Sequence, residues 1–213
     1  MYRNFRKNSC LIYMNIDKNM KDDKILENML YIAIFFILVI YFRGYFMIRY
    51  IDIIPTIKVY PDNDIEILVV NNIVEDNNQY YIDLFKKTDE SVVYAFREIV
   101  DIDIDSEKMM NIVLSPHVLL VTLLLKTTIN RARPRQINPD LNIQKSLSAN
   151  TPAYPSGHCI QAYYLAKQLS LEYPERSDEF FKLAEDCALS RVYAGLHFPS
   201  DNDFGKYISL NIL

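Results

Sequence analysis

Three segments decide how this chain folds: KTTINRARP at 126–134, AYPSGH at 153–158 and SRVYAGLHFPSD at 190–201. They place lysine and arginine side chains, a glycine-containing turn, two histidines and a carboxylate in a fixed order along the carboxy-terminal half. The stretches between them have helical rather than alternating hydrophobic spacing. We therefore expect a helical framework that brings the three segments together at one site.

The first expectation for this site is that it binds phosphate. Arginine presents a planar fork of N–H donors that matches a phosphate edge, and lysine adds a point charge. Lys126, Arg133 and Arg191 supply these cations. Ser156 and Gly157 stand where a helix is expected to begin, and the first backbone N–H groups of a helix favour an anion.

The second expectation is histidine chemistry. A histidine can act as nucleophile or as general acid near neutral pH. Asp201 follows His197 by four residues, so its carboxylate can hold one ring nitrogen and leave the other free to attack phosphorus. A departing alkoxide needs a proton, and His158 is the candidate donor. His117 stands apart from the three segments and is interpreted as structural.

The three segments resemble the signature motifs of the type 2 phosphatidic acid phosphatase superfamily. That superfamily includes lipid phosphate phosphatases, class A nonspecific acid phosphatases and vanadium-dependent haloperoxidases. The resemblance implies an all-α antiparallel bundle with its active site at helix ends. It also implies a phosphohistidine at His197, aimed by Asp201, with His158 as general acid. The phosphate would be bound by the remaining motif residues: Lys126, Arg133, Ser156, Gly157 and Arg191.

We expect a phosphatase, and keep a haloperoxidase and a non-catalytic binding protein as the two alternatives. A phosphatase would need neither metal nor cofactor and would hydrolyse a phosphorylated small molecule or a lipid phosphate. A haloperoxidase would hold vanadate in the same pocket, with His197 as its ligand. A non-catalytic, membrane-tethered phosphate-binding protein would not need the nucleophile, its orienting carboxylate and the acid together. A lid over the site could come from residues 135–151.

Residues 1–50 are predicted to form a tail outside the catalytic domain. Residues 29–42 form an unbroken apolar run, and the apolar character continues to residue 48. A membrane span needs about 20 such residues, so 29–48 is compatible with one span, a buried core helix or a hairpin on the membrane surface. Lysines before the run favour a cytoplasmic amino terminus. We therefore expect a membrane-associated protein whose catalytic domain lies on the non-cytoplasmic side.

Residues 51–213 are predicted to form the phosphatase domain. Prolines and Asn/Asp residues indicate an irregular approach over 51–77. Residues 118–125 are almost entirely apolar and predict a core helix that ends at Lys126. Ser200 and Asp203 have the spacing of a helix-capping box. The other helices are expected at 92–100, from 106, at 158–171 and at 177–194.

Composition restricts the partners and the redox chemistry. The net charge of −4 argues against a nucleic-acid partner. The three cysteines, Cys10, Cys159 and Cys187, have no metal-ligand spacing. Buried free thiols are the favoured interpretation, and a Cys159–Cys187 bridge remains the alternative.

Overall fold

The computed structural model describes residues 59–99 and 104–213. Every regular element in this part of the chain is a helix, so the predicted all-α class is confirmed. The predictions for the tail 1–50 and the apolar segment 29–48 lie outside the described residues. The elements in chain order are α2 (Asn63–Asp76), α3 (Gln79–Thr88), α4 (Val93–Ile99), α5 (Ser106–Val113), α6 (Pro116–Ile129), α7 (Pro134–Ile137), α8 (Gly157–Glu172), a 3₁₀ turn (Pro174–Arg176), α9 (Ser177–Tyr193) and α10 (Pro199–Asn211).

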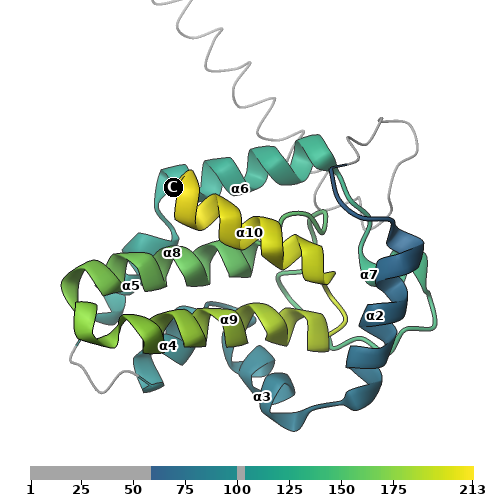
Figure 1. Ribbon diagram of the computed structural model, residues 1–213, viewed down its shortest axis with the longest axis horizontal. Helices are drawn as coiled ribbons and strands as arrows, with labels where there is room; N and C mark the ends of the chain where they lie inside the picture. The colour runs from purple at the N-terminus through teal and green to yellow at the C-terminus, as the bar shows by residue number, and fades with distance from the viewer. Residues whose placement is uncertain (1–58, 100–103) are drawn as a thin grey trace, which may run out of the picture. The chain divides into compact units, whose positions relative to one another are not determined.

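Helices α8 and α9 form an antiparallel hairpin at the centre of the described domain (Figure 1). The turn Pro174–Arg176 joins them, and their facing sides bury small and apolar residues such as Ala162, Ala166 and Ala184. Small side chains let the helix axes approach closely, while larger neighbours fill the core around them. Because the hairpin is antiparallel, the beginning of α8 and the end of α9 lie at the same end of the bundle.

Helix α2 occupies a segment for which we predicted an irregular structure, and that prediction was wrong. The Asn and Asp residues that suggested a loop instead cap a helix at both ends. Asp62 accepts a hydrogen bond from the amide of Asp64 at 2.9 Å, and Asn77 ends the helix in the left-handed conformation. Between these caps, Ile67 and Val70 are buried in a cluster with residues of α9 and the start of α10.

Helix α6 contains the apolar run 118–125, but it is only partly a core helix. Val118 and Ile129 are buried, whereas four leucines are more than a third exposed: Leu119, Leu120, Leu123 and Leu124. By length and composition, Ser106–Ile137 is the one helical stretch of the described residues suited to crossing a membrane. The apolar pattern alone could not predict which side of α6 would be left uncovered.

Cys159 and Cys187 are both buried free thiols. Cys159 donates to the backbone carbonyl of Asn202 at 3.1 Å, and its side chain packs against Gly205 of α10. The favoured interpretation of these two cysteines is therefore confirmed, and the alternative of a bridge between them is not.

Candidate active site

His197 is placed by the way α9 ends. Gly195 adopts φ +72°, and its amide donates to the carbonyl of Val192 while the amide of Leu196 donates to the carbonyl of Arg191. These two bonds are the Schellman pattern, in which a left-handed residue reverses the chain after a helix. The five residues between Arg191 and His197 are therefore the last turn of α9 and its reversal. The fixed spacing in the third segment has this structural cause.

Asp201 holds His197 in one orientation. The carboxylate oxygen Oδ2 of Asp201 lies 3.0 Å from Nδ1 of His197 and also accepts the amide of Phe198 at 2.9 Å. A carboxylate can only accept, so Nδ1 carries the proton and Nε2 keeps its lone pair. Nη1 of Arg133 lies 3.2 Å from that Nε2, an arrangement consistent with N–H donation to it. His197 therefore presents an unprotonated nitrogen at the site.

The hydrogen bond from Phe198 also corrects a sequence prediction. Helix α10 begins at Pro199 with Phe198 as its N-cap residue. Asp201, rather than Asp203, reaches back to cap the first turn, and Ser200 lies inside the helix. The same carboxylate therefore both starts α10 and aims His197, so the position of the imidazole is tied to the helix terminus.

Two basic side chains from the first segment line the same cavity as His197. Lys126 is buried near the end of α6, and its Nζ donates to the carbonyl of Pro152 at 2.6 Å. Arg133 stands just before α7, where Nε donates to the carbonyl of Thr151 and Nη1 to that of Leu196, each at 2.8 Å. These carbonyls fix both side chains before any ligand binds, which lowers the entropic cost of holding an anion.

Arg191 supplies the third cation, and its main partner is Asp89. Nη1 of Arg191 lies 2.9 Å from Oδ1 of Asp89, and Nη2 donates to Ser148 at 3.1 Å. Asp89 also accepts the hydroxyl of Ser146 at 2.6 Å and the amide of Leu147 at 2.9 Å. The loop that follows α7 is thus tied to Arg191 through one carboxylate. Asp89 lies outside the three motif segments, so the sequence patterns did not place it at the site.

One donor of Arg191 has no partner among the described residues. The Nε of this buried side chain makes no hydrogen bond. Leaving a buried donor unsatisfied costs about 1–3 kcal/mol. An anion bound in the pocket is one group that could satisfy it.

The start of α8 contributes His158 and backbone amides. Gly157 is the first residue of α8, and a Cβ there would make ordinary contacts with Thr122 and Lys126 at 3.5 and 3.6 Å. Nε2 of His158 lies 3.0 Å from the carbonyl oxygen of Asp89, so Nε2 carries a proton. Ser156 is placed differently from the expectation. Its amide donates to the backbone carbonyl of Asp201 at 3.0 Å and is therefore already engaged.

These groups line a cavity of about 360 Å³. Six of the eight residues predicted for the site line it: Lys126, Arg133, Gly157, His158, Arg191 and His197. Asp201 lies behind His197, and Ser156 lies behind the first turn of α8. Leu119 and Leu123 of α6 form an apolar part of the wall, which the motifs did not indicate.

The cavity favours uncharged histidines when it holds no anion. Burial, followed by the charge of Arg191, lowers the pKa of His158 to about 3. Burial and the charges of Arg133 and Lys126 lower the pKa of His197 well below its ordinary value. Burial raises the pKa of Asp201, and the charge of Arg131 opposes that rise. A neutral His197 is the form that a nucleophile requires.

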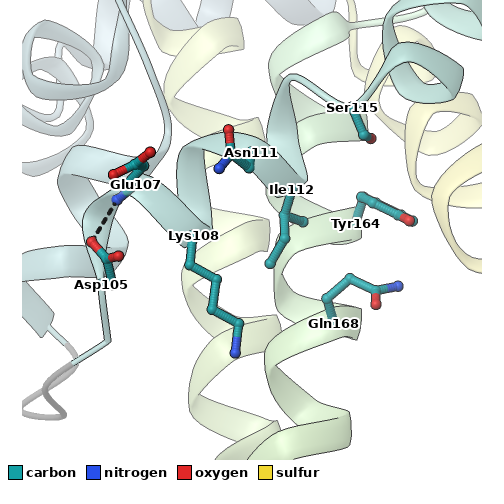
Figure 2. A pocket seen from close by; sticks show the side chains of 8 residues that line it. All are labelled: Asp105, Glu107, Lys108, Asn111, Ile112, Ser115, Tyr164 and Gln168. Atoms are coloured by element: carbon teal, nitrogen blue, oxygen red, sulfur yellow. Dashed lines mark hydrogen bonds between the residues drawn. The ribbon is translucent and has the colours of Figure 1, made fainter.

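A second hollow lies between α5 and α8 and has different chemistry (Figure 2). Its volume is about 590 Å³, and its walls include Glu107, Lys108, Asn111 and Tyr164. The one cation among its lining residues, Lys108, pairs with Glu172 at 2.7 Å. Neither His158 nor His197 lines this hollow, so the two motif histidines are found at the smaller cavity.

Comparison with known proteins supports the resemblance seen in the motifs. The family model of the PAP2 superfamily matches residues 110–213, the stretch that contains all three motif segments. Over these residues the chain is similar to the PAP2 superfamily. The resemblance seen in the motifs is therefore confirmed.

Two curated relatives match a shorter part of the chain. The non-specific acid phosphatases of Salmonella typhi and Salmonella typhimurium are each 41% identical over 56 residues, which is 26% of this chain. The chain spans 22% of the length of either relative. Among solved structures, a transmembrane PAP2 type phosphatidylglycerolphosphate phosphatase from Bacillus subtilis matches with a TM-score of 0.36 and 21% identity. That match covers 70% of this chain and 77% of the other.

Proposed function

We propose that this PAP2 protein hydrolyses phosphate monoesters through a phosphohistidine formed at Nε2 of His197. The observation that carries the proposal is the 3.0 Å contact between Asp201 and Nδ1 of His197, which leaves Nε2 unprotonated beside three cations. Binding alone would not need a ring nitrogen held in this tautomer. The acid phosphatase relatives support the same reaction class.

The proposed reaction has two steps, transfer of the phosphoryl group to His197 and hydrolysis of the phosphohistidine. The lone pair of Nε2 on His197 forms the P–N bond while the ester P–O bond breaks, and the leaving oxygen takes a proton from His158. Lys126, Arg133 and Arg191 stabilise the negative charge on the phosphoryl oxygens. Water then attacks phosphorus and gives a proton back to His158, and the P–N bond breaks to release phosphate.

His158 must gain a proton before it can act as the acid. Its low pKa in the empty cavity is caused by burial and by Arg191. A phosphate ester brings negative charge into the cavity and opposes both effects, so ligand binding raises this pKa. Because Nε2 already donates to Asp89, the proton for the leaving group comes from Nδ1.

We propose that the reaction is independent of metal ions. Among residues 59–99 and 104–213, no group of three or more His, Cys, Asp or Glu side chains is arranged to hold a metal ion. The three cations can neutralise the phosphoryl oxygens themselves. In the haloperoxidase alternative the same cations would hold vanadate, whose charge and shape resemble those of phosphate.

The test is phosphate release by the purified chain from an aryl phosphate in the presence of a chelator. We expect turnover that orthovanadate inhibits, and loss of turnover in His197→Ala but not in His117→Ala. His117 is an exposed histidine hydrogen-bonded to Tyr164, so it is a matched control. Parallel assays on phosphatidic acid and on soluble phosphomonoesters rank the substrates. Halide oxidation with vanadate, and no phosphate release, would favour the haloperoxidase alternative.

We also propose that the domain contacts a lipid surface through α6. Leu119 and Leu123 line the cavity wall, and Leu120 and Leu124 are 57% and 49% exposed on the same helix. Burying these side chains in an interface would stabilise the contact by about 1.5–3 kcal/mol for each leucine fully transferred. The earlier prediction, that the membrane contact runs through residues 29–48, lies outside the described residues.

Co-sedimentation with phospholipid vesicles tests this contact. Leu120→Asn/Leu124→Asn should weaken vesicle binding several-fold, while Leu171→Asn should not. Leu171 is 73% exposed near the end of α8 and controls for the loss of any surface leucine. Equal vesicle binding by the wild type and the α6 variant would contradict the proposal.

A further inference from the structure

The carboxylate that aims His197 is itself held by a buried arginine outside the predicted site. Nη1 of Arg131 lies 2.7 Å from Oδ1 of Asp201, the oxygen that His197 does not use. Both side chains in this pair are fully buried. A buried charge pair needs excellent geometry to offset the cost of removing both ions from water. The orientation of Asp201 is therefore coupled to Arg131.

The Arg131 guanidinium is held by hydrogen bonds, ion pairs and aromatic rings. Nη2 lies 2.6 Å from Oε2 of Glu66, and Nε donates to Oδ1 of Asn63 at 3.0 Å. The guanidinium is stacked over the rings of Phe198, at 3.9 Å, and Tyr60, at 4.3 Å. Cation–π contacts of this kind are strongest when water is excluded. The guanidinium has little freedom to leave Asp201.

Glu66 connects this arginine to the first turn of α10. Its Oε1 accepts the amide of Ser200 at 3.1 Å, and its Oε2 accepts the hydroxyl of Ser200 at 2.5 Å. Ser200 also accepts from Nη1 of Arg131 at 2.8 Å. Helix α2 is thus bonded to the same turn that carries Asp201. A displacement of Glu66 would be transmitted to Asp201 through Ser200 and through Arg131.

We propose that Glu66 and Arg131 are positioning residues for the reaction, acting through Asp201 to keep Nε2 of His197 aimed at phosphorus. Neither lines the cavity, and neither would touch the substrate. The inference rests on the proposed function, because its main measurement is phosphatase turnover. It goes beyond that function by extending the site to α2, outside the family match that begins at residue 110.

A double-mutant cycle in kcat tests the proposal. Arg131→Met should lower kcat about 10- to 100-fold, the size of effect seen when the hydrogen-bonding partner of a metal ligand is removed. KM should stay within about threefold, because substrate contacts remain. In an Asp201→Asn background, Arg131→Met should lower kcat by less than about threefold. The ion pair through which Arg131 acts is already lost in that background. Arg176→Met, which removes a surface pair with Glu179, is the matched control.

Two conservative variants keep the proposal testable if Arg131→Met does not fold. Glu66→Gln preserves shape and should lower kcat about three- to tenfold with KM unchanged. Arg131→Lys keeps the charge but cannot reach Asp201 and Glu66 with separate nitrogens, so its kcat should fall between those of Arg131→Met and the wild type. An unchanged kcat in both variants would overturn the proposal.

Nitrogen-15 NMR of His197 separates this proposal from the proposed function. The wild type should show the tautomer with the proton on Nδ1, and Arg131→Met or Glu66→Gln should reduce its population. A wild type without phosphatase activity would contradict the proposed function, while the NMR comparison would still test the positioning role. The positioning role would be overturned if the His197 tautomer were unchanged in these variants. It would also be overturned if Arg131→Met lowered kcat equally with and without the Asp201 carboxylate.

Discussion

His197 and Asp201 are joined by a hydrogen bond of 3.0 Å between Nδ1 and Oδ2, and both side chains are buried at the beginning of α10. The bond determines which ring nitrogen carries the proton. It also ties His197 to a helix terminus, because the same oxygen caps the first turn through Phe198. Much of the proposed chemistry depends on this one contact.

Asp201→Asn should therefore lower kcat far more than it raises KM. The amide can no longer accept reliably from Nδ1, so His197 would be held in the wrong tautomer, a change that can cost up to about 10⁴-fold in a comparable triad. Steady-state kinetics on an aryl phosphate measure it. Asp203→Asn, an exposed residue two positions later in α10, should behave as the wild type. Equal kcat in the two variants would contradict the orienting role of Asp201.

The role of His158 predicts a dependence on the leaving group. His158→Gln should lower kcat about 10²- to 10⁴-fold for an alkyl phosphate, whose alkoxide needs a proton as it departs. The loss should be much smaller for a nitrophenyl phosphate, because nitrophenolate leaves without protonation. Kinetics across a series of leaving groups check this. The same loss for every substrate would show that His158 does not act as the general acid.

Acid should destabilise the domain below about pH 6.5. His158 and His197 have pKa values lowered by burial, whereas unfolded histidines titrate near 6.5. The unfolded state then binds more protons, so the free energy of unfolding falls by up to about 1.4 kcal/mol per pH unit for each group. Urea denaturation at pH 7.5 and 5.5, without phosphate, measures the fall.

His197→Gln should show a shallower loss of stability with acid than the wild type, because it removes one of the two groups. Measurements stay above pH 5, because Asp89, whose pKa is lowered by hydrogen bonds and Arg191 despite its burial, adds its own loss only in more acidic solution. A wild-type slope near zero between pH 7.5 and 5.5 would rule out the neutral buried histidines.

Gly195→Ala should damage both stability and activity. Position 195 has φ +72°, and an added Cβ would lie 2.8 Å from Cγ2 of Ile143. Backbone strain in the left-handed region costs about 1–3 kcal/mol, and relief of the clash would shift the reversal that delivers His197. Thermal melts and kcat measure the two effects. Gly157→Ala, whose Cβ would make only ordinary contacts, should keep its stability. A fully stable and active Gly195→Ala would contradict this explanation of the motif spacing.

The site was more predictable from the sequence than the surfaces around it. The spacings around His158 and His197 reflect local geometry, namely a helix start and a Schellman reversal, which short patterns record well. The contacts of Asp89 and Glu66 join segments far apart in the chain, and no local pattern signals such pairing. Arg131 and Arg133 both lie in the first motif segment. The sequence does not show that Arg131 pairs with Asp201 while Arg133 lines the cavity.

Helix α2 was predicted wrongly and helix α6 only partly correctly, for related reasons. The polar residues of α2 were interpreted as a loop, although Asn and Asp are also strongly preferred at helix N-caps. The apolar run in α6 was interpreted as core, but apolar composition does not say what covers each face. Whether α2 forms a helix and which side of α6 is buried both depend on contacts with residues distant in the sequence.

The central claim is that a phosphoryl group is transferred to His197, and trapping that intermediate is its most direct test. Rapid mixing with a phosphate ester, quenching in alkali and peptide mass spectrometry should find phosphate on Nε2 of His197. The bound phosphate should be absent from His197→Ala and present in His117→Ala. Phosphate found on another residue, or turnover that persists in His197→Ala, would contradict the account.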